Sequence, residues 1–164
     1  MQIICLNCRG PLKKTGQDYT CSCCGKVYST YGNAINFVDE YIDNGIIDVY
    51  ENINDKYNET SIGKYVNFMN LGYCENSNEN LIGKSAFQNS IINRNSISLI
   101  LKIFYQMNLE NLDVLDLGCG RCGAIYTIQR MYKSCRLYGI DICKNGLLGK
   151  ITNNELIICD FQND

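Results

Sequence analysis

The sequence predicts a mixed α/β chain in three parts: a cysteine-rich module, a helical linker and a partial parallel sheet. Residues 1–40 contain two pairs of closely spaced cysteines, and apolar residues recur at helical spacing within 41–108. Over 109–164, short apolar segments typical of strands alternate with segments typical of helices. Strands separated by helices of about ten residues form βαβ units, whose strands run parallel. With 164 residues, the chain has room for one ordinary domain, or for a small module and a fragment of a larger domain.

The composition excludes several classes of function. Hydrophobic residues make up 46% of the chain, which is enough for a core, and the net charge of -2 argues against a general binder of nucleic acids or anionic membranes. The chain has no histidine, so it has no histidine-dependent triad and no imidazole base. Its first residues lack the charged and apolar regions typical of a signal peptide, and no apolar run approaches the roughly 20 residues of a membrane span, so we expect a cytoplasmic protein without membrane contact.

The first part carries two C-x-x-C pairs, Cys5 with Cys8 and Cys21 with Cys24. Two such pairs can present four thiolates to one ion, which is the closed tetrahedral site of a zinc ribbon. The odd total of 11 cysteines favours reduced thiols with a metal over a disulfide framework. Redox dithiols and unligated core cysteines are the alternatives.

Cys23 complicates the assignment of the second pair. It would make that pair C-x-C rather than C-x-x-C, so we assign Cys24 as the ligand. A site closed by four thiolates cannot activate water, and we expect it to serve folding and docking. The module has little apolar sequence of its own, so the ion must hold it together.

The middle part is expected to contain two helices. The first, within residues 41–60, is indicated by apolar residues at helical spacing, namely Ile46, Val49, Tyr50, Ile53 and Tyr57. The second runs from about Ser85 to Met107. The polar, asparagine-rich stretch 67–80 between them is predicted to be a loop.

The last part reads as strand, helix, strand, weak helix and strand. The expected strands are 113–117, 137–141 and 156–160, and the expected helices are 124–132 and 144–150. The sequence stops straight after the third strand, so we expect a sheet that is truncated at this point.

A glycine-rich turn, G-C-G-R-C-G, follows the first of these strands. Gly118 and Gly120 allow a tight turn whose backbone can approach a ligand, and Gly123 is expected to let the next helix pack closely on the strand. Asp116 precedes the turn, and Asp141 ends the second strand, where a carboxylate can bind ribose hydroxyls.

The motifs Asp116-Leu117-Gly118-Cys119-Gly120, Gly139-Ile140-Asp141 and Ile158-Cys159-Asp160-Phe161 together resemble the opening half of a class I S-adenosylmethionine-dependent methyltransferase, with its Rossmann-like sheet. The resemblance implies that Asp116, Gly118, Cys119 and Gly120 meet the methionine end of the cofactor. It implies that Asp141 binds the ribose, that Ile142 packs on the adenine, and that Asp160 and Phe161 contact the adenine.

Two other interpretations of the turn remain. A dinucleotide oxidoreductase needs a pyrophosphate on the helix N-terminus, and the charge of Asp116 would oppose it, whereas that charge suits an ammonium and a sulfonium. A structural turn without a ligand is the second alternative.

Two further stretches are also similar to methyltransferases. Tyr65–Tyr73, followed by Asn93–Ser96, resembles enzymes that modify natural products and lipids, in which the aromatic segment lies over the cofactor pocket. Alternatively, these aromatic residues simply cover the edge of the sheet. The zinc ribbon resembles the N-terminal module of ribosomal-RNA guanine methyltransferases and the small activators of tRNA methyltransferases.

The sequence therefore predicts a methyltransferase that acts on a small, lipid-like or natural-product substrate. An RNA methyltransferase, or a non-catalytic zinc-ribbon partner of one, is the alternative, and no catalytic residue can be named. The family resemblance implies that strand 113–117 is central in its sheet, so its free side needs cover. The helix at 85–107, a second copy or a partner chain could supply this cover, and we expect self-association or low stability.

Overall fold

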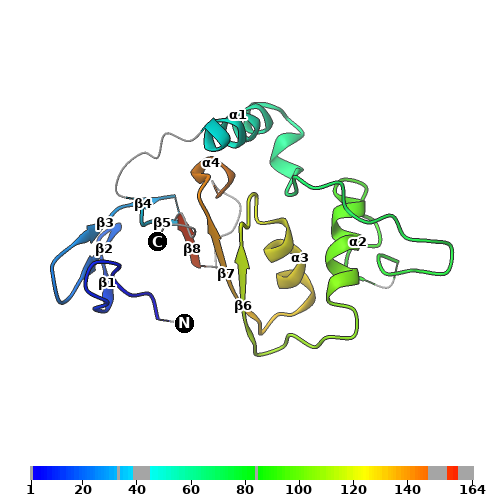
Figure 1. The fold of residues 1–164 in the computed structure, drawn as a ribbon. Helices are drawn as coiled ribbons and strands as arrows, with labels where there is room; N and C mark the ends of the chain where they lie inside the picture. Colours follow the sequence, from blue (N-terminus) through cyan, green and yellow to red (C-terminus); the bar gives the residue numbers. More distant parts are fainter. Residues whose placement is uncertain (1, 33, 39–44, 84, 148–154, 159–164) are drawn as a thin grey trace.

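The computed structural model describes residues 2–32, 34–38, 45–83, 85–147 and 155–158 (Figure 1). Its strands are β1 Leu12–Thr15, β2 Asp18–Cys21, β3 Val27–Tyr28, β4 Thr30–Tyr31, β5 Ala34–Asn36, β6 Asp113–Leu117, β7 Arg136–Asp141 and β8 Glu155–Ile158. Its helices are α1 Gly45–Glu59, the 3-10 helix η1 Gly63–Tyr65, α2 Arg94–Ile103, α3 Gly123–Met131 and α4 Lys144–Leu147. The protein is thus a mixed α/β chain, as the sequence predicts.

The N-terminal module is a three-stranded antiparallel sheet in the order β1-β2-β3. Each of its two cysteine-rich turns is closed by backbone hydrogen bonds. The Cys5 amide donates to the Gly10 carbonyl at 2.8 Å, and the Cys21 amide donates to the Lys26 carbonyl at 2.8 Å. These two turns carry the two cysteine pairs.

A second sheet has five strands in the order β4-β5-β8-β7-β6. The pairs β6–β7, β7–β8 and β8–β5 are parallel, while β4 is antiparallel to β5. The alternation of strand and helix after residue 109 is therefore confirmed for the described residues. Strands β4 and β5 lie within the expected range of the cysteine-rich module but belong to this sheet, because β5 pairs with β8.

The two faces of this sheet pack against different parts of the chain. On one face, Ala34, Val114 and Leu137 belong to a core that also contains residues of α2 and α3. On the other face, Ile35 and Ile140 pack against the core of the cysteine-rich module. Figure 1 accordingly shows the sheet between the module and helices α3 and α2.

Helix α2 is shorter than predicted, since residues 85–93 form turns rather than the first half of a helix. Asparagine and serine are frequent in this stretch, and their side chains compete with helical backbone hydrogen bonds. The Ser85 hydroxyl, for example, donates to the Ile82 carbonyl and accepts the Phe87 amide. Asn93 then adopts a left-handed conformation, with φ of 63°, at the start of α2.

Helix α1 forms where expected, but its apolar stripe is not its buried face. Val49 is 57% exposed and Tyr50 is 46% exposed, whereas Ile47 and the polar Asn54 are buried. The periodicity predicted the helix correctly but does not indicate which face is buried. None of the described helices is both long enough and apolar enough to span a membrane.

Strand β6 is an edge strand among the described residues. Leu115 is 46% exposed and Leu117 is 57% exposed on this strand. Helix α2 packs against α3 and leaves both leucines exposed, so it does not supply the cover that was one of the possibilities for this strand.

Candidate functional site

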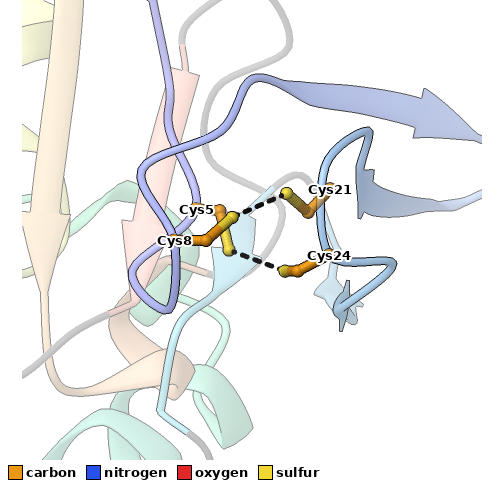
Figure 2. Close-up of side chains that lie close together, drawn as sticks. All are labelled: Cys5, Cys8, Cys21 and Cys24. Atoms are coloured by element: carbon orange, nitrogen blue, oxygen red, sulfur yellow. Dashed lines mark hydrogen bonds between the residues drawn. The ribbon is translucent and has the colours of Figure 1, made fainter.

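The four cysteines of the two C-x-x-C pairs meet in one cluster (Figure 2). Their sulfur atoms all lie within 4.8 Å of one another. The Sγ atoms of Cys5 and Cys24 are 3.6 Å apart, and those of Cys8 and Cys21 are 3.4 Å apart. Zinc–sulfur bonds of about 2.3 Å in a tetrahedron separate the sulfurs by about 3.8 Å, so this geometry is compatible with a zinc ribbon.

Cys24, and not Cys23, belongs to the cluster, in agreement with the assignment from spacing. Cys23 is exposed, and it packs against Gly10. A Cβ atom at Gly10 would lie 2.6 Å from the Cys23 sulfur and 3.1 Å from the Cys21 sulfur, so this turn has no room for a side chain at residue 10.

Tyr28 supports the cluster from outside, a role that no sequence pattern indicated. Its hydroxyl lies 3.1 Å from the Cys5 sulfur and accepts the Leu6 amide at 3.0 Å. Burial raises the pKa of Cys5, but hydrogen bonds from Tyr28 and from the amides of Cys8 and Asn7 outweigh burial and lower this pKa to about 6. These donors stabilise a thiolate, which is the form that binds metal.

The glycine-rich turn lies between β6 and α3 and is fastened to β7. The amides of Gly118 and Cys119 donate to the Ile140 carbonyl at 2.8 and 3.0 Å. Gly118 and Gly120 have φ of 74° and 51°, a conformation that glycine adopts without strain. Within the part of the chain that the structure describes, no atom lies within 4 Å of a Cβ built at either glycine, so the turn borders open space there.

The two described acids beside the turn lie on the same face of the sheet. The register pairs Asp116 with Gly139, and Asp141 is two residues further along β7. Asp141 is buried and accepts the Gly120 amide at 2.7 Å and the Cys143 amide at 2.8 Å. Within the described residues, no donor is hydrogen-bonded to Asp116, and burial together with the charge of Asp141 raises the pKa of Asp116 to about 6.

Two cavities border the turn and share Met69, Gly118 and Gly120 as lining residues. One measures about 310 Å³ and extends along residues 67–70, and the other measures about 320 Å³ and extends toward α1. Both are at the lower end of the size range of small-molecule sites. The predicted residues that line one or both cavities are Asp116, Gly118, Cys119, Gly120, Asp141 and Ile142. Asp160 and Phe161 lie outside the described residues.

The aromatic segment 65–73 reaches these cavities only through its middle: residues 67–70 line one of them, and Met69 also lines the other. Phe68 and the Asn67 carbonyl lie against Gly123, where an added Cβ would be 2.6 and 2.4 Å away from them. Gly123 therefore makes room for this segment. The sequence predicts that this glycine makes room for contact between the helix and the strand, and not for residues 67 and 68. The Asn93 side chain donates to the Tyr65 carbonyl at 2.7 Å and so ties the segment to α2.

Arg121, inside the glycine-rich turn, is a structural residue that sequence reasoning missed. It is only 1% exposed, and all its hydrogen-bond acceptors are neutral. Its Nε donates to the Val66 carbonyl at 2.7 Å, and its Nη atoms donate to Asn54, Asn58 and the Gly63 carbonyl at 2.9 to 3.1 Å. Arg121 thus holds α1 and η1 over the turn and leaves the charges of Asp116 and Asp141 available to a ligand.

A further cavity of about 400 Å³ lies between α2 and residues 78–85. Its charged groups satisfy each other, because Glu79 accepts hydrogen bonds from both Tyr73 and Lys102. It is lined by neither acid of the turn.

A scan of protein-family models finds no match to this chain, and a search of curated proteins finds no significantly similar sequence.

Proposed function

We propose that the chain binds S-adenosylmethionine at the glycine-rich turn as the cofactor half of a class I methyltransferase, with a structural zinc ion in the N-terminal module. The observation that carries this proposal is the pair of acids, Asp116 and Asp141, beside an open turn at the carboxyl ends of adjacent parallel strands. Ligands of open α/β sheets bind at this end of the strands.

The charge around the turn supports this cofactor over a dinucleotide. Asp116 and Asp141 are the acidic groups lining the two cavities, and the lining cation, Arg121, is engaged by four neutral acceptors. Among the described lining residues, a pyrophosphate would meet two carboxylates and no available cation. An ammonium and a sulfonium would meet complementary charge.

The chain's own residues would bind and orient the cofactor rather than act as acids or bases. Asp116 suits the positively charged methionine end, and the unused lone pairs of Asp141 suit the ribose hydroxyls. When bound, S-adenosylmethionine supplies an electrophilic methyl group whose thioether leaving group needs no acid. Met69 and Phe68, from the segment over the turn, would exclude water from one side of the site.

The acceptor that fits best is a small or lipid-like molecule. The net charge of -2 gives the chain no general attraction for RNA, which favours a small substrate over the alternative of an rRNA or tRNA methyltransferase. A non-catalytic role as a zinc-ribbon partner of another chain would require that the turn bind no cofactor.

Isothermal titration with S-adenosylmethionine tests the proposal. We expect binding in the micromolar range and a loss of at least tenfold in Asp141→Asn, which removes the charge and one acceptor. Asp113→Asn is the matched control, because Asp113 begins the same strand as Asp116 but is exposed and pairs with Arg136. Absence of heat at millimolar cofactor, with the zinc content and the circular dichroism spectrum intact, would exclude binding of S-adenosylmethionine. The non-catalytic role as a zinc-ribbon partner of another chain would then remain.

A further inference from the structure

The glycine-rich turn contains a third C-x-x-C pair, Cys119 and Cys122, which lies outside the four-sulfur cluster. We propose that this pair is a redox-active dithiol, which a small-molecule disulfide entering the neighbouring cavity converts to an internal disulfide. The pair is distinct from the four-sulfur cluster, because neither cysteine belongs to that cluster and Cys119 lines a cavity beside the turn.

The backbone already places the two cysteines at the separation that a disulfide needs. The Cys122 amide donates to the Cys119 carbonyl at 2.8 Å, which closes a four-residue turn. Such turns hold their end Cα atoms within about 7 Å, and disulfides span Cα distances of about 4.4 to 6.8 Å. The two thiols also interact, since a hydrogen bond that the Cys119 thiol donates to Cys122 is the largest of the effects that raise the pKa of Cys119, followed by burial and by the charges of Asp141 and Asp116.

The two thiols differ in access, which assigns them different steps. Cys119 is 7% exposed and lines the cavity beside residues 67–70, whereas Cys122 is fully buried and does not line this cavity. Cys122 also has φ of 61°, a left-handed conformation that costs a residue other than glycine about 1 kcal/mol or more. Strain of this kind persists where the surrounding structure imposes it.

The reaction is thiol–disulfide exchange in two steps. The Cys119 thiolate attacks one sulfur of the incoming disulfide, forms a mixed disulfide and releases one thiol, which takes up the proton that Cys119 lost. The Cys122 thiolate then attacks the Cys119 sulfur, forms the internal disulfide and releases the second thiol with the proton of Cys122. The protein loses two electrons and two protons, and the incoming disulfide gains them as two thiols.

Differential alkylation of the zinc-loaded full chain, equilibrated with oxidised glutathione, tests the proposal. Free thiols are blocked with N-ethylmaleimide in denaturant, and the disulfides are then reduced, labelled with iodoacetamide and located by mass spectrometry. We expect Cys119 and Cys122 to acquire the second label together and in equal amounts, while Cys135 remains blocked by the first reagent. The proposal is overturned if both keep the first label, or if Cys119 is oxidised without Cys122.

A variant separates the two steps. In Cys122→Ser, Cys119 should accumulate as the mixed disulfide with glutathione, whereas Cys135→Ser should behave as the parent chain does. The measurement on the parent chain decides the question by itself if Cys122→Ser fails to fold.

One consequence rests on the proposed function. Cofactor bound at the turn would cover Cys119, so saturating S-adenosylmethionine should slow formation of the disulfide at least tenfold. If titration detects no cofactor binding, the proposed function fails while the dithiol measurement stands. If the cofactor binds and the rate of oxidation is unchanged, access through this cavity is wrong.

Discussion

Replacing Arg121 with methionine should detach α1 and η1 from the glycine-rich turn. The guanidinium is buried and bonded to four acceptors, of which Asn54 is itself only 1% exposed. Arg121→Met keeps much of the apolar stem and removes every one of these donors.

The size of the effect follows from the acceptors left behind. The acceptors on Asn54 and Gly63 lie on buried residues, and a buried polar group without a partner costs about 1–3 kcal/mol, which gives about 2–6 kcal/mol for the pair. Removal of a buried cation returns part of this cost, because ion desolvation is unfavourable. We therefore expect the free energy of unfolding to fall by about 3 kcal/mol. Arg121→Lys should recover little of it, since one ammonium cannot reach acceptors spread around a planar guanidinium.

Urea unfolding followed by circular dichroism measures the stability of the variants, and hydrogen exchange locates the change. Protection should be lost over residues 45–66 and retained in β1–β3. Arg130→Met is the matched control, because Arg130 is exposed and donates to Tyr126 on its own helix, so its loss should cost about 0.5 kcal/mol or less. If Arg121→Met has the free energy of unfolding of the parent chain, or loses protection uniformly, then Arg121 does not hold α1 and η1 over the turn.

Three more predictions concern the metal, the turn and the edge strand. Purified protein should contain one zinc per chain by elemental analysis, with the metal retained in Cys23→Ser and reduced in Cys24→Ser; a folded, metal-free module would contradict the assignment. Gly120→Val should lose cofactor binding but keep its zinc, whereas Gly16→Val, at a similar φ of 68° in the β1–β2 turn, should retain cofactor binding. Light scattering should detect concentration-dependent association through strand β6, and Leu115→Lys should abolish it. Val27→Lys, at a comparably exposed residue of β3, should leave the association unchanged. A parent chain that stays monomeric at high concentration would refute association through this strand.

The features that the sequence predicted correctly depend on short-range patterns. C-x-x-C spacing determines which sulfurs can meet, so the membership of the cluster followed from four positions. Strand β6 has the expected bounds, because five residues of mostly apolar character end at a glycine. The turn that joins it to α3 is likewise determined by residues close together in the chain.

The features that sequence reasoning missed depend on contacts between distant residues. Nothing within residues 34–36 indicates that β5 pairs with β8, more than 100 residues later, because a three-residue strand carries little pattern. The orientation of α1 does not follow from its apolar stripe, because the polar Asn54 is buried and accepts a hydrogen bond from Arg121, while Val49 and Tyr50 of the stripe are exposed. The spacing of apolar residues along one helix cannot anticipate a buried arginine contributed by another segment.

Asp116 shows how a binding role can oppose stability at a single residue. Burial and the neighbouring charge of Asp141 raise its pKa to about 6 from an ordinary value of 3.8. Between pH 4 and pH 6 the folded state therefore binds a proton that the unfolded state has lost, so the free energy of unfolding falls as the pH rises through this window. Above pH 6 the carboxylate is charged, and its full unfavourable contribution is present in the folded protein.

Asp116→Asn should consequently be more stable than the parent chain at pH 7, by about 1–2 kcal/mol once solvent screening of this partly exposed carboxyl is allowed for. The same substitution should weaken binding of S-adenosylmethionine, because the ionised carboxylate attracts the cationic ligand. In the parent chain, affinity should rise between pH 5 and pH 7, whereas in Asp116→Asn this rise should be absent. Urea unfolding and titration calorimetry at pH 5, 6 and 7 measure both quantities. If the variant is less stable at pH 7 and binds the cofactor as the parent does, then Asp116 is a structural residue and the charge argument for this pocket is wrong.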